Sequence, residues 1–273
     1  MTATRRPLPW RAELGRQTRR RRTLSSFVLL LALPLVVVGA FAIGGAEVDG
    51  DGTLVDLATG GAANFAVFTT AVSASFLLVV LAALFVGDSL PAEASWSTLR
   101  YLLVAPVPRT RLLASKLVVG LATVAVAVVL LVAWSVVVGG IAYGWAGFTN
   151  PTGGSLEWGT FAGRLALAAA YLVLTLVQVG AIAFCLGTRT DAPLAAVGGA
   201  VMVTIVTAIL GQIDDLGSLR NALPMYWADT WFELLRPTVD WTPIGHGVAW
   251  SLLHTAVFTV LGFELFRRKD VLS

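Results

Sequence analysis

Charged residues in this chain fall in blocks, and six stretches between the blocks contain no Asp, Glu, Lys or Arg. These stretches are residues 23–46, 57–87, 117–156, 165–188, 192–213 and 241–263. Each reaches the roughly 20 residues that a helix needs to cross about 30 Å of hydrocarbon. Gly and Pro residues between positions 144 and 154 break the longest stretch, so it predicts one span followed by a loop. We therefore predict an all-α polytopic membrane protein with six transmembrane helices.

The predicted organisation is a single transmembrane domain over residues 1–273. A cytoplasmic connecting helix is expected at residues 1–26, a cytoplasmic coupling loop at 87–116 and an extracytoplasmic segment at 214–245. The predicted spans cover about residues 27–46, 65–86, 117–142, 164–186, 194–213 and 246–266.

Composition agrees with a membrane location. Hydrophobic residues make up 57% of the chain and charged residues only 13%, and the mean hydropathy is +0.81. A soluble domain carries about 25% charged residues, so this chain has too little polar surface to cover a water-soluble body. The net charge of +3 does not indicate nucleic acid as a partner, because the basic residues flank apolar stretches.

The distribution of basic residues predicts the orientation. With the N-terminus in the cytoplasm, 16 of the 19 Lys and Arg residues fall in cytoplasmic segments. Short cytoplasmic loops of membrane proteins are enriched in Lys and Arg. Both termini are therefore predicted to be cytoplasmic.

The N-terminal stretch has the composition of an interfacial helix. Trp10 and Leu14 are one helical turn apart, Glu13 lies between them, and several arginines follow. Such a helix can lie among lipid headgroups, where each Arg near anionic lipid contributes roughly 1 kcal/mol. The alternative is that the arginines only fix the topology.

The loop between the second and third spans has the pattern of an amphipathic helix at residues 92–104. Trp96, Leu99 and Leu103 recur at helical spacing, while Glu93 and Arg100 take another face. A helix of this kind either lies on the lipid surface or docks on a protein. A second helix is expected to run from residue 109 into the third span.

The outer segment before the last span is rich in aromatic residues and prolines. Trp and Tyr favour the membrane–water interface, where an apolar ring and a polar N–H or O–H are both accommodated. The pattern predicts a short helix or a re-entrant element at the outer leaflet. The alternative is a passive aromatic belt.

The chain lacks a recognisable catalytic or metal-binding constellation. His246 and His254 are eight residues apart, which is not the i, i+4 spacing of a helical two-histidine metal site. Neither Lys116 nor Lys269 lies in a Gly-Lys-Ser/Thr phosphate-binding loop, so any ATPase is expected to be a separate polypeptide. We expect no catalytic, cofactor-binding or metal-ligating residues. A proteolytic or lipid-modifying enzyme is accordingly disfavoured.

Gln178 is the most polar side chain near the middle of a predicted span. It is a candidate for a substrate path, although a hydrogen bond between helices is the favoured explanation. The span centres carry no ionisable residue of the kind that couples transport to an ion gradient.

The coupling loop resembles the corresponding loop of type-2 ATP-binding-cassette (ABC) exporter permeases, a bacterial family. In that family an acidic residue precedes a Gly-Thr-Leu-Arg segment, a Pro-Val-Ser-Arg turn and a Lys at the entry to the third span. Ser97 replaces the usual Gly here, and Pro108 replaces the usual Ser. The matching residues are Glu93, Thr98, Leu99, Arg100, Pro106, Val107, Arg109 and Lys116. The stretch containing Trp10, Glu13 and Leu14 resembles the family's connecting helix.

This resemblance implies that the helix at 92–104 is a coupling helix inserted into a groove of a cytoplasmic ABC ATPase subunit. ATP and Mg would be bound on that partner, and a second permease subunit, identical or similar, would complete the transporter in the membrane lipid. The expected function is the membrane subunit of an exporter for a hydrophobic or amphipathic compound in the bacterial cytoplasmic membrane. The alternative is a non-transporting anchor or regulatory subunit of an ATPase complex. The residues expected to couple to the ATPase are Glu93, Trp96, Thr98, Leu99, Arg100, Leu103, Pro106, Arg109, Arg111 and Lys116.

Overall fold

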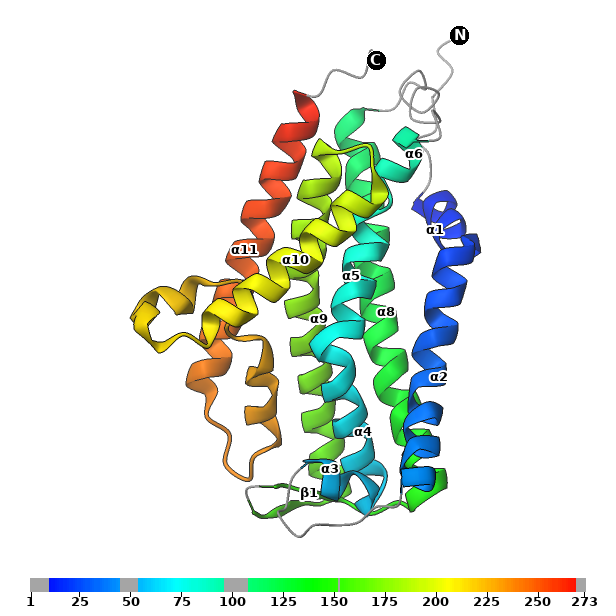
Figure 1. Ribbon diagram of the computed structural model, residues 1–273, viewed down its shortest axis with the longest axis vertical. Coiled ribbons are helices and arrows are strands. Elements are labelled where there is room, and N and C mark those ends of the chain that lie inside the picture. The colour runs from blue at the N-terminus through cyan, green and yellow to red at the C-terminus, as the bar shows by residue number, and fades with distance from the viewer. Residues whose placement is uncertain (1–9, 45–53, 96–107, 152, 269–273) are drawn as a thin grey trace.

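The protein is an elongated helical bundle (Figure 1). The structure is a computed structural model that describes residues 10–44, 54–95, 108–151 and 153–268. Within these ranges, six helices are long and apolar enough to cross a membrane, which confirms the all-α, six-span prediction. They are α2 (Arg21–Gly44), the second span Ala62–Gly87, α8 (Arg109–Tyr143), α9 (Trp158–Arg189), α10 (Pro193–Gly211) and α11 (Trp241–Arg267).

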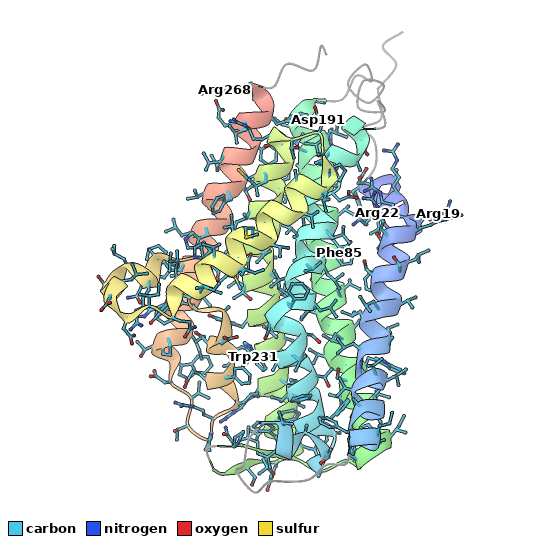
Figure 2. All side chains as sticks on the ribbon, viewed as in Figure 1. Arg19, Arg22, Phe85, Asp191, Trp231 and Arg268 are labelled. Carbon is cyan, nitrogen blue, oxygen red and sulfur yellow. The ribbon has the colours of Figure 1, made fainter. Side chains whose placement is uncertain are left out.

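Short elements mark the two ends of the bundle. At one end, called the α1 end below, lie α1 (Trp10–Arg19) and α6 (Pro91–Ser95) (Figure 1). At the other, the hairpin end, lie α3 (Leu54–Leu57), η1 (Ala58–Gly60) and the antiparallel strands β1 (Phe148–Thr149) and β2 (Ser155–Leu156). Arg19, Arg22 and Arg268 all lie toward the α1 end (Figure 2).

The helices extend beyond the predicted spans. α2 begins at Arg21 rather than near residue 27, and α11 begins at Trp241 rather than near 246. Flanking polar residues can continue a helix into the interface, where water still reaches their side chains. α8 begins at Arg109, as the sequence predicts, directly after Pro108. It ends at Gly144, whose φ of 81° is a left-handed conformation that suits glycine.

α9 is the central helix of the bundle. It contacts α5, α8, α10 and α11. Many of its buried residues are small, including Ala168, Ala181 and Ala183. Small side chains allow helix backbones to approach closely, which is how helices associate inside lipid. By contrast, α2 and α11 leave much of their apolar surface exposed.

The second span is not a uniform α-helix. It consists of α4 (Ala62–Val72), the π-helix η2 (Ser73–Leu77) and α5 (Leu78–Gly87). A π-helix adds a residue to a turn and is often found at functional sites. Nothing in the apolar pattern of this span predicted the irregular turn.

The loop after the third span is a small β-hairpin, where the sequence predicted only an interfacial loop. Phe148 pairs with Leu156, and Thr149 pairs with Ser155. Asn64, buried at the start of α4, holds the hairpin through two bonds: its Nδ2 donates to the Thr149 carbonyl at 2.7 Å, and its Oδ1 accepts from the Thr149 N–H at 2.9 Å. This side chain therefore links the hairpin to the second span.

Replacing Asn64 by Ala is expected to lower the free energy of unfolding by about 1–2 kcal/mol, because both hydrogen bonds to Thr149 are lost. Unfolding in mixed detergent micelles, followed by circular dichroism, would measure the change. Asn221→Ala is the matched control, since no hydrogen bond of the Asn221 side chain is found in the part of the chain that the structure describes. Equal losses in both variants would contradict a specific role of Asn64.

The outer segment folds into two 3-10 helices, η3 (Asp214–Ala222) and η4 (Ala228–Leu235). In Figure 1 this segment turns back along the bundle beside α10 and α11 instead of capping its end. Trp231 of η4 is fully buried and packs on Phe232, with 3.9 Å between ring centroids. η4 is thus packed into the bundle, whereas no residue of η3 is buried.

Candidate functional site

A group of charged side chains is gathered at the α1 end. Its members come from α1, from the residue between α1 and α2, from the first turn of α2, from the turn after α5, from α6 and from α8. A neutral hydrogen bond also joins α1 to the second span: the carbonyl of Phe85 accepts from Gln17 Nε2 at 3.3 Å. We call the group the charge cluster; it consists of Glu13, Arg16, Arg20, Arg22, Asp88, Glu93 and Lys116.

Lys116 is the centre of the charge cluster. Its Nζ donates to Glu13 Oε1 at 2.8 Å and to Glu93 Oε1 at 2.5 Å. The Lys116 side chain is only 1% exposed, and the two glutamates are 8% and 10% exposed. One buried ammonium on α8 therefore joins α1 and α6, which are far apart in the sequence.

Arginines complete the charge cluster toward its surface. Arg22 Nη1 lies 2.5 Å from Asp88 Oδ1, and Arg20 Nη1 lies 3.6 Å from Asp88 Oδ2. Arg16 Nη1 lies 3.7 Å from Glu13 Oε2. Asp88 follows the second span directly, so these pairs attach the start of α2 to the end of that span.

The charge cluster is suited to positioning rather than to covalent chemistry. Four cations surround three carboxylates, so each buried carboxylate has an opposite charge nearby. Buried ions that are mutually paired avoid the cost of isolated burial. In the described ranges, no group of three or more His, Cys, Asp or Glu could hold a metal ion.

The structure brings Glu13, Glu93 and Lys116 together, three of the residues that the sequence singled out. Arg111 is exposed on α8, and Trp10 and Leu14 are 60% and 37% exposed on α1. Arg109 is the first residue of α8, and its side chain is outside the description. The other predicted coupling residues lie outside the described residues: Trp96, Thr98, Leu99, Arg100, Leu103 and Pro106.

Sequence reasoning missed Asp88 and the arginines that pair with it. A usable signal existed in the sequence, because Asp88 comes directly after an apolar span. A carboxylate at such a position requires a nearby cation. Arg20 and Arg22, at the start of the first span, were the available candidates.

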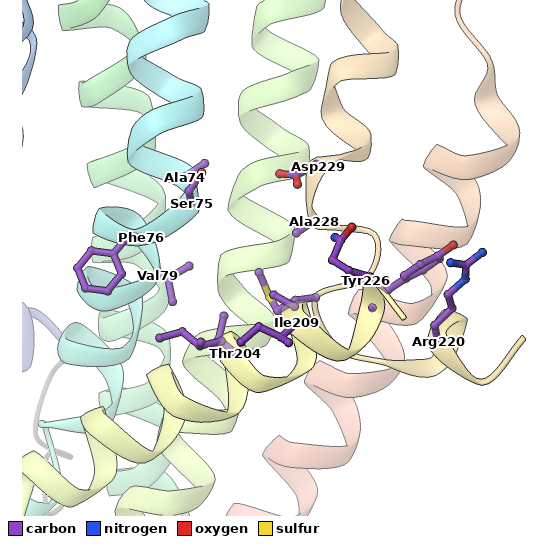
Figure 3. Close-up of a pocket in the computed structure, with 15 residues that line it drawn as sticks. Ala74, Ser75, Phe76, Val79, Thr204, Ile209, Arg220, Tyr226, Ala228 and Asp229 are labelled. Atoms are coloured by element: carbon purple, nitrogen blue, oxygen red, sulfur yellow. The ribbon is translucent and has the colours of Figure 1, made fainter. Parts of the chain in front are cut away.

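A cavity of about 500 Å³ lies further along the bundle, between the π-helix of the second span, α10 and the outer segment (Figure 3). Its wall includes Ser75, Phe76 and Thr204 from the spans, and Tyr226 and Asp229 from the outer segment. Ligand sites commonly have volumes of 300–1,000 Å³, so its size suits a small molecule.

Polar side chains of the spans hold the backbone of the outer segment. Tyr171 Oη on α9 donates to the carbonyl of Trp227 at 2.7 Å, and His254 Nε2 on α11 lies 3.1 Å from the carbonyl of Ala222. Carbonyls in irregular backbone and at helix ends need such partners when they lie among membrane spans. His254 therefore has a structural partner.

Gln178 of α9 also holds the backbone of the outer segment. Its side chain is fully buried, and its Nε2 donates to the carbonyl of Pro224. Gln178 is not among the residues that line the cavity. Its contact is thus with the outer segment, a partner that neither sequence interpretation of this residue named.

The sequence model of one protein family matches residues 40–272, which is most of the chain. The chain belongs to that family. Its description is "protein of unknown function" (DUF2705). The DUF2705 match includes Asp88, Glu93 and Lys116 of the charge cluster but not the residues of α1. No curated protein matches the sequence. A functional conclusion therefore depends on the residues themselves.

Proposed function

We propose that this chain is the membrane-spanning permease subunit of an ABC transporter, an exporter of a hydrophobic or amphipathic compound. ATP hydrolysis takes place on a separate cytoplasmic ATPase subunit, and a second permease subunit completes the transporter. The α1 end faces the cytoplasm of a bacterial cell, because most Lys and Arg residues lie in segments assigned to that side.

One observation carries the proposal: the buried contact of Lys116 with Glu13 and Glu93. Glu93 and Lys116 are two of the residues on which the resemblance to ABC exporter permeases rests. Glu13 belongs to the stretch that resembles the connecting helix. Their contact gives a physical route by which a push on the coupling loop reaches α1 and the third span. A subunit driven by a separate ATPase requires such a route.

Affinity purification of the full chain from its native membrane, with mass spectrometry of co-eluting proteins, tests the proposal. An ATPase with a phosphate-binding loop is expected to co-elute and to hydrolyse ATP in a vanadate-sensitive manner. Leu99→Asp places a charge on the predicted coupling face and is expected to remove at least nine-tenths of the bound ATPase, since truncation of a central apolar anchor costs 2 kcal/mol or more. Leu219→Asp, at an exposed leucine of the outer segment, is the matched control and should keep it.

Absence of any ATPase after mild crosslinking would overturn the proposal. Equal loss in both variants would show a general effect of the added charge and would also count against it. The complex can also be reconstituted in vesicles and offered a series of compounds. If the bound ATPase responds to none of them, the result would favour a non-transporting regulatory subunit.

A further inference from the structure

The charged residues that line the cavity are Arg220 and Asp229, and only one of them is balanced by a neighbour. Arg220 Nη1 lies 2.5 Å from Asp214 Oδ1, and its guanidinium lies 5.5 Å from the centre of the Tyr226 ring. The charge of Arg220 is therefore satisfied within the outer segment.

Asp229 has no comparable partner. Within the described ranges, no Lys or Arg forms an ion pair with its carboxylate. The Asp229 side chain lines the cavity and is exposed. Partial desolvation of this side chain raises the pKa of the Asp229 carboxyl. A cation entering the cavity would relieve the cost of the unbalanced carboxylate.

The opposite wall mixes apolar side chains with hydroxyl groups. The π-helix places Ala74, Ser75 and Phe76 on the cavity, and the Phe76 side chain is 59% exposed. Figure 3 shows Asp229 across from Ala74 and Ser75. The cavity thus combines one carboxylate with hydrocarbon and an aromatic ring, which is the complement of a molecule with a charged head and an apolar body.

We propose that this cavity binds an amphipathic organic cation, with its positive centre beside Asp229 and its hydrocarbon against Phe76, Val79 and Ile209. Binding needs only this chain. The further step, that the cation is the exported compound, rests on the proposed function. Binding in this cavity removes the apolar part of the ligand from water and keeps its positive charge beside the Asp229 carboxylate. The bound state is therefore favoured over the ligand in free solution.

Equilibrium dialysis of the full chain in lipid nanodiscs tests the proposal, with empty nanodiscs as the blank. The probes are tetraphenylphosphonium, a bulky apolar cation, and triphenylphosphine oxide, a neutral molecule of similar shape. Wild-type protein is expected to bind tetraphenylphosphonium saturably. Asp229→Asn removes the charge with little change in size and should weaken that binding at least tenfold, while binding of the neutral probe changes less than twofold.

Two further variants make the result specific. Asp215→Asn removes an exposed acid of the same segment that does not line the cavity, and should leave both probes unaffected. Ala208→Phe fills the cavity and should weaken both probes. Thermal unfolding of each variant confirms that it remains folded.

The proposal is overturned if wild-type protein binds the cation no better than empty nanodiscs. It is also overturned if folded Asp229→Asn binds the cation within twofold of wild type, or if Ala208→Phe has no effect. Because this assay contains no ATPase, its failure leaves the proposed function standing. Failure to recover an ATPase partner likewise leaves the binding site standing.

Discussion

Lys116→Met is expected to lower the free energy of unfolding by about 3–5 kcal/mol, the range found when one partner of a buried ion pair is removed. Methionine preserves most of the side-chain volume but not the ammonium. Glu13 and Glu93 would then face each other near the vacated ammonium position, both almost completely buried. Reversible unfolding of the full chain in mixed micelles containing dodecyl sulfate, followed by circular dichroism, measures the loss.

A nearby residue on the same helix provides the control. Arg111→Met removes a cation of α8 that is exposed to solvent, and its effect should stay within about 0.5 kcal/mol. Adding Glu13→Gln and Glu93→Gln to Lys116→Met should restore more than half of the lost stability, because the two carboxylates that lost the ammonium are then replaced by neutral amides. If the neutralised triple variant is as unstable as Lys116→Met, the cost comes from packing and the electrostatic explanation is wrong.

The number and nature of the spans could be predicted because lipid imposes one strong requirement. Backbone groups in hydrocarbon must be satisfied within the segment, so an uncharged apolar run of sufficient length must be a helix. Charge pairs within one helix could also be predicted, because they depend only on the spacing of the two residues along that helix. Glu264 pairs with Arg267 and Arg268 at 2.9 and 2.7 Å, three and four residues away.

The charge cluster could be predicted only in part. Glu13, Glu93 and Lys116 were each singled out, but for separate reasons: an N-terminal helix, an amphipathic loop and the entry to a span. Glu13 and Lys116 are separated by 103 positions in the sequence. No local pattern specifies a contact between such distant residues, because it depends on how whole helices pack.

The π-helix and the cavity beside it had no sequence signal. The span from Ala62 to Gly87 contains no charged residue, and its apolar pattern does not mark the turn that becomes the π-helix. The sequence did not single out Asp229, because its exposure to a cavity depends on how the outer segment turns back. The partners of that segment were partly predictable, since a polar side chain such as Gln178 in a span must bond to something.

Gly247→Ala is expected to lower the free energy of unfolding by about 2–4 kcal/mol. A Cβ at this position of α11 would overlap the hydroxyl group of Tyr171 and come within 3.1 Å of Trp227 Cβ. Overpacking alone costs about 1–3 kcal/mol. The displaced Tyr171 would also lose its hydrogen bond to the Trp227 carbonyl, which holds the outer segment to α9.

Gly245→Ala is the matched control, because a Cβ added two residues earlier on the same helix would meet no atom within 4 Å. Alanine favours helix over glycine by up to about 1 kcal/mol, so this variant should be neutral or slightly more stable. Limited proteolysis should show earlier cleavage of the outer segment in Gly247→Ala alone, since only that variant displaces Tyr171. Opposite signs for the two substitutions would show that the close approach of α9 and α11 at Gly247, and not helix propensity, holds the outer segment in place. Similar effects of both would contradict this role of Gly247.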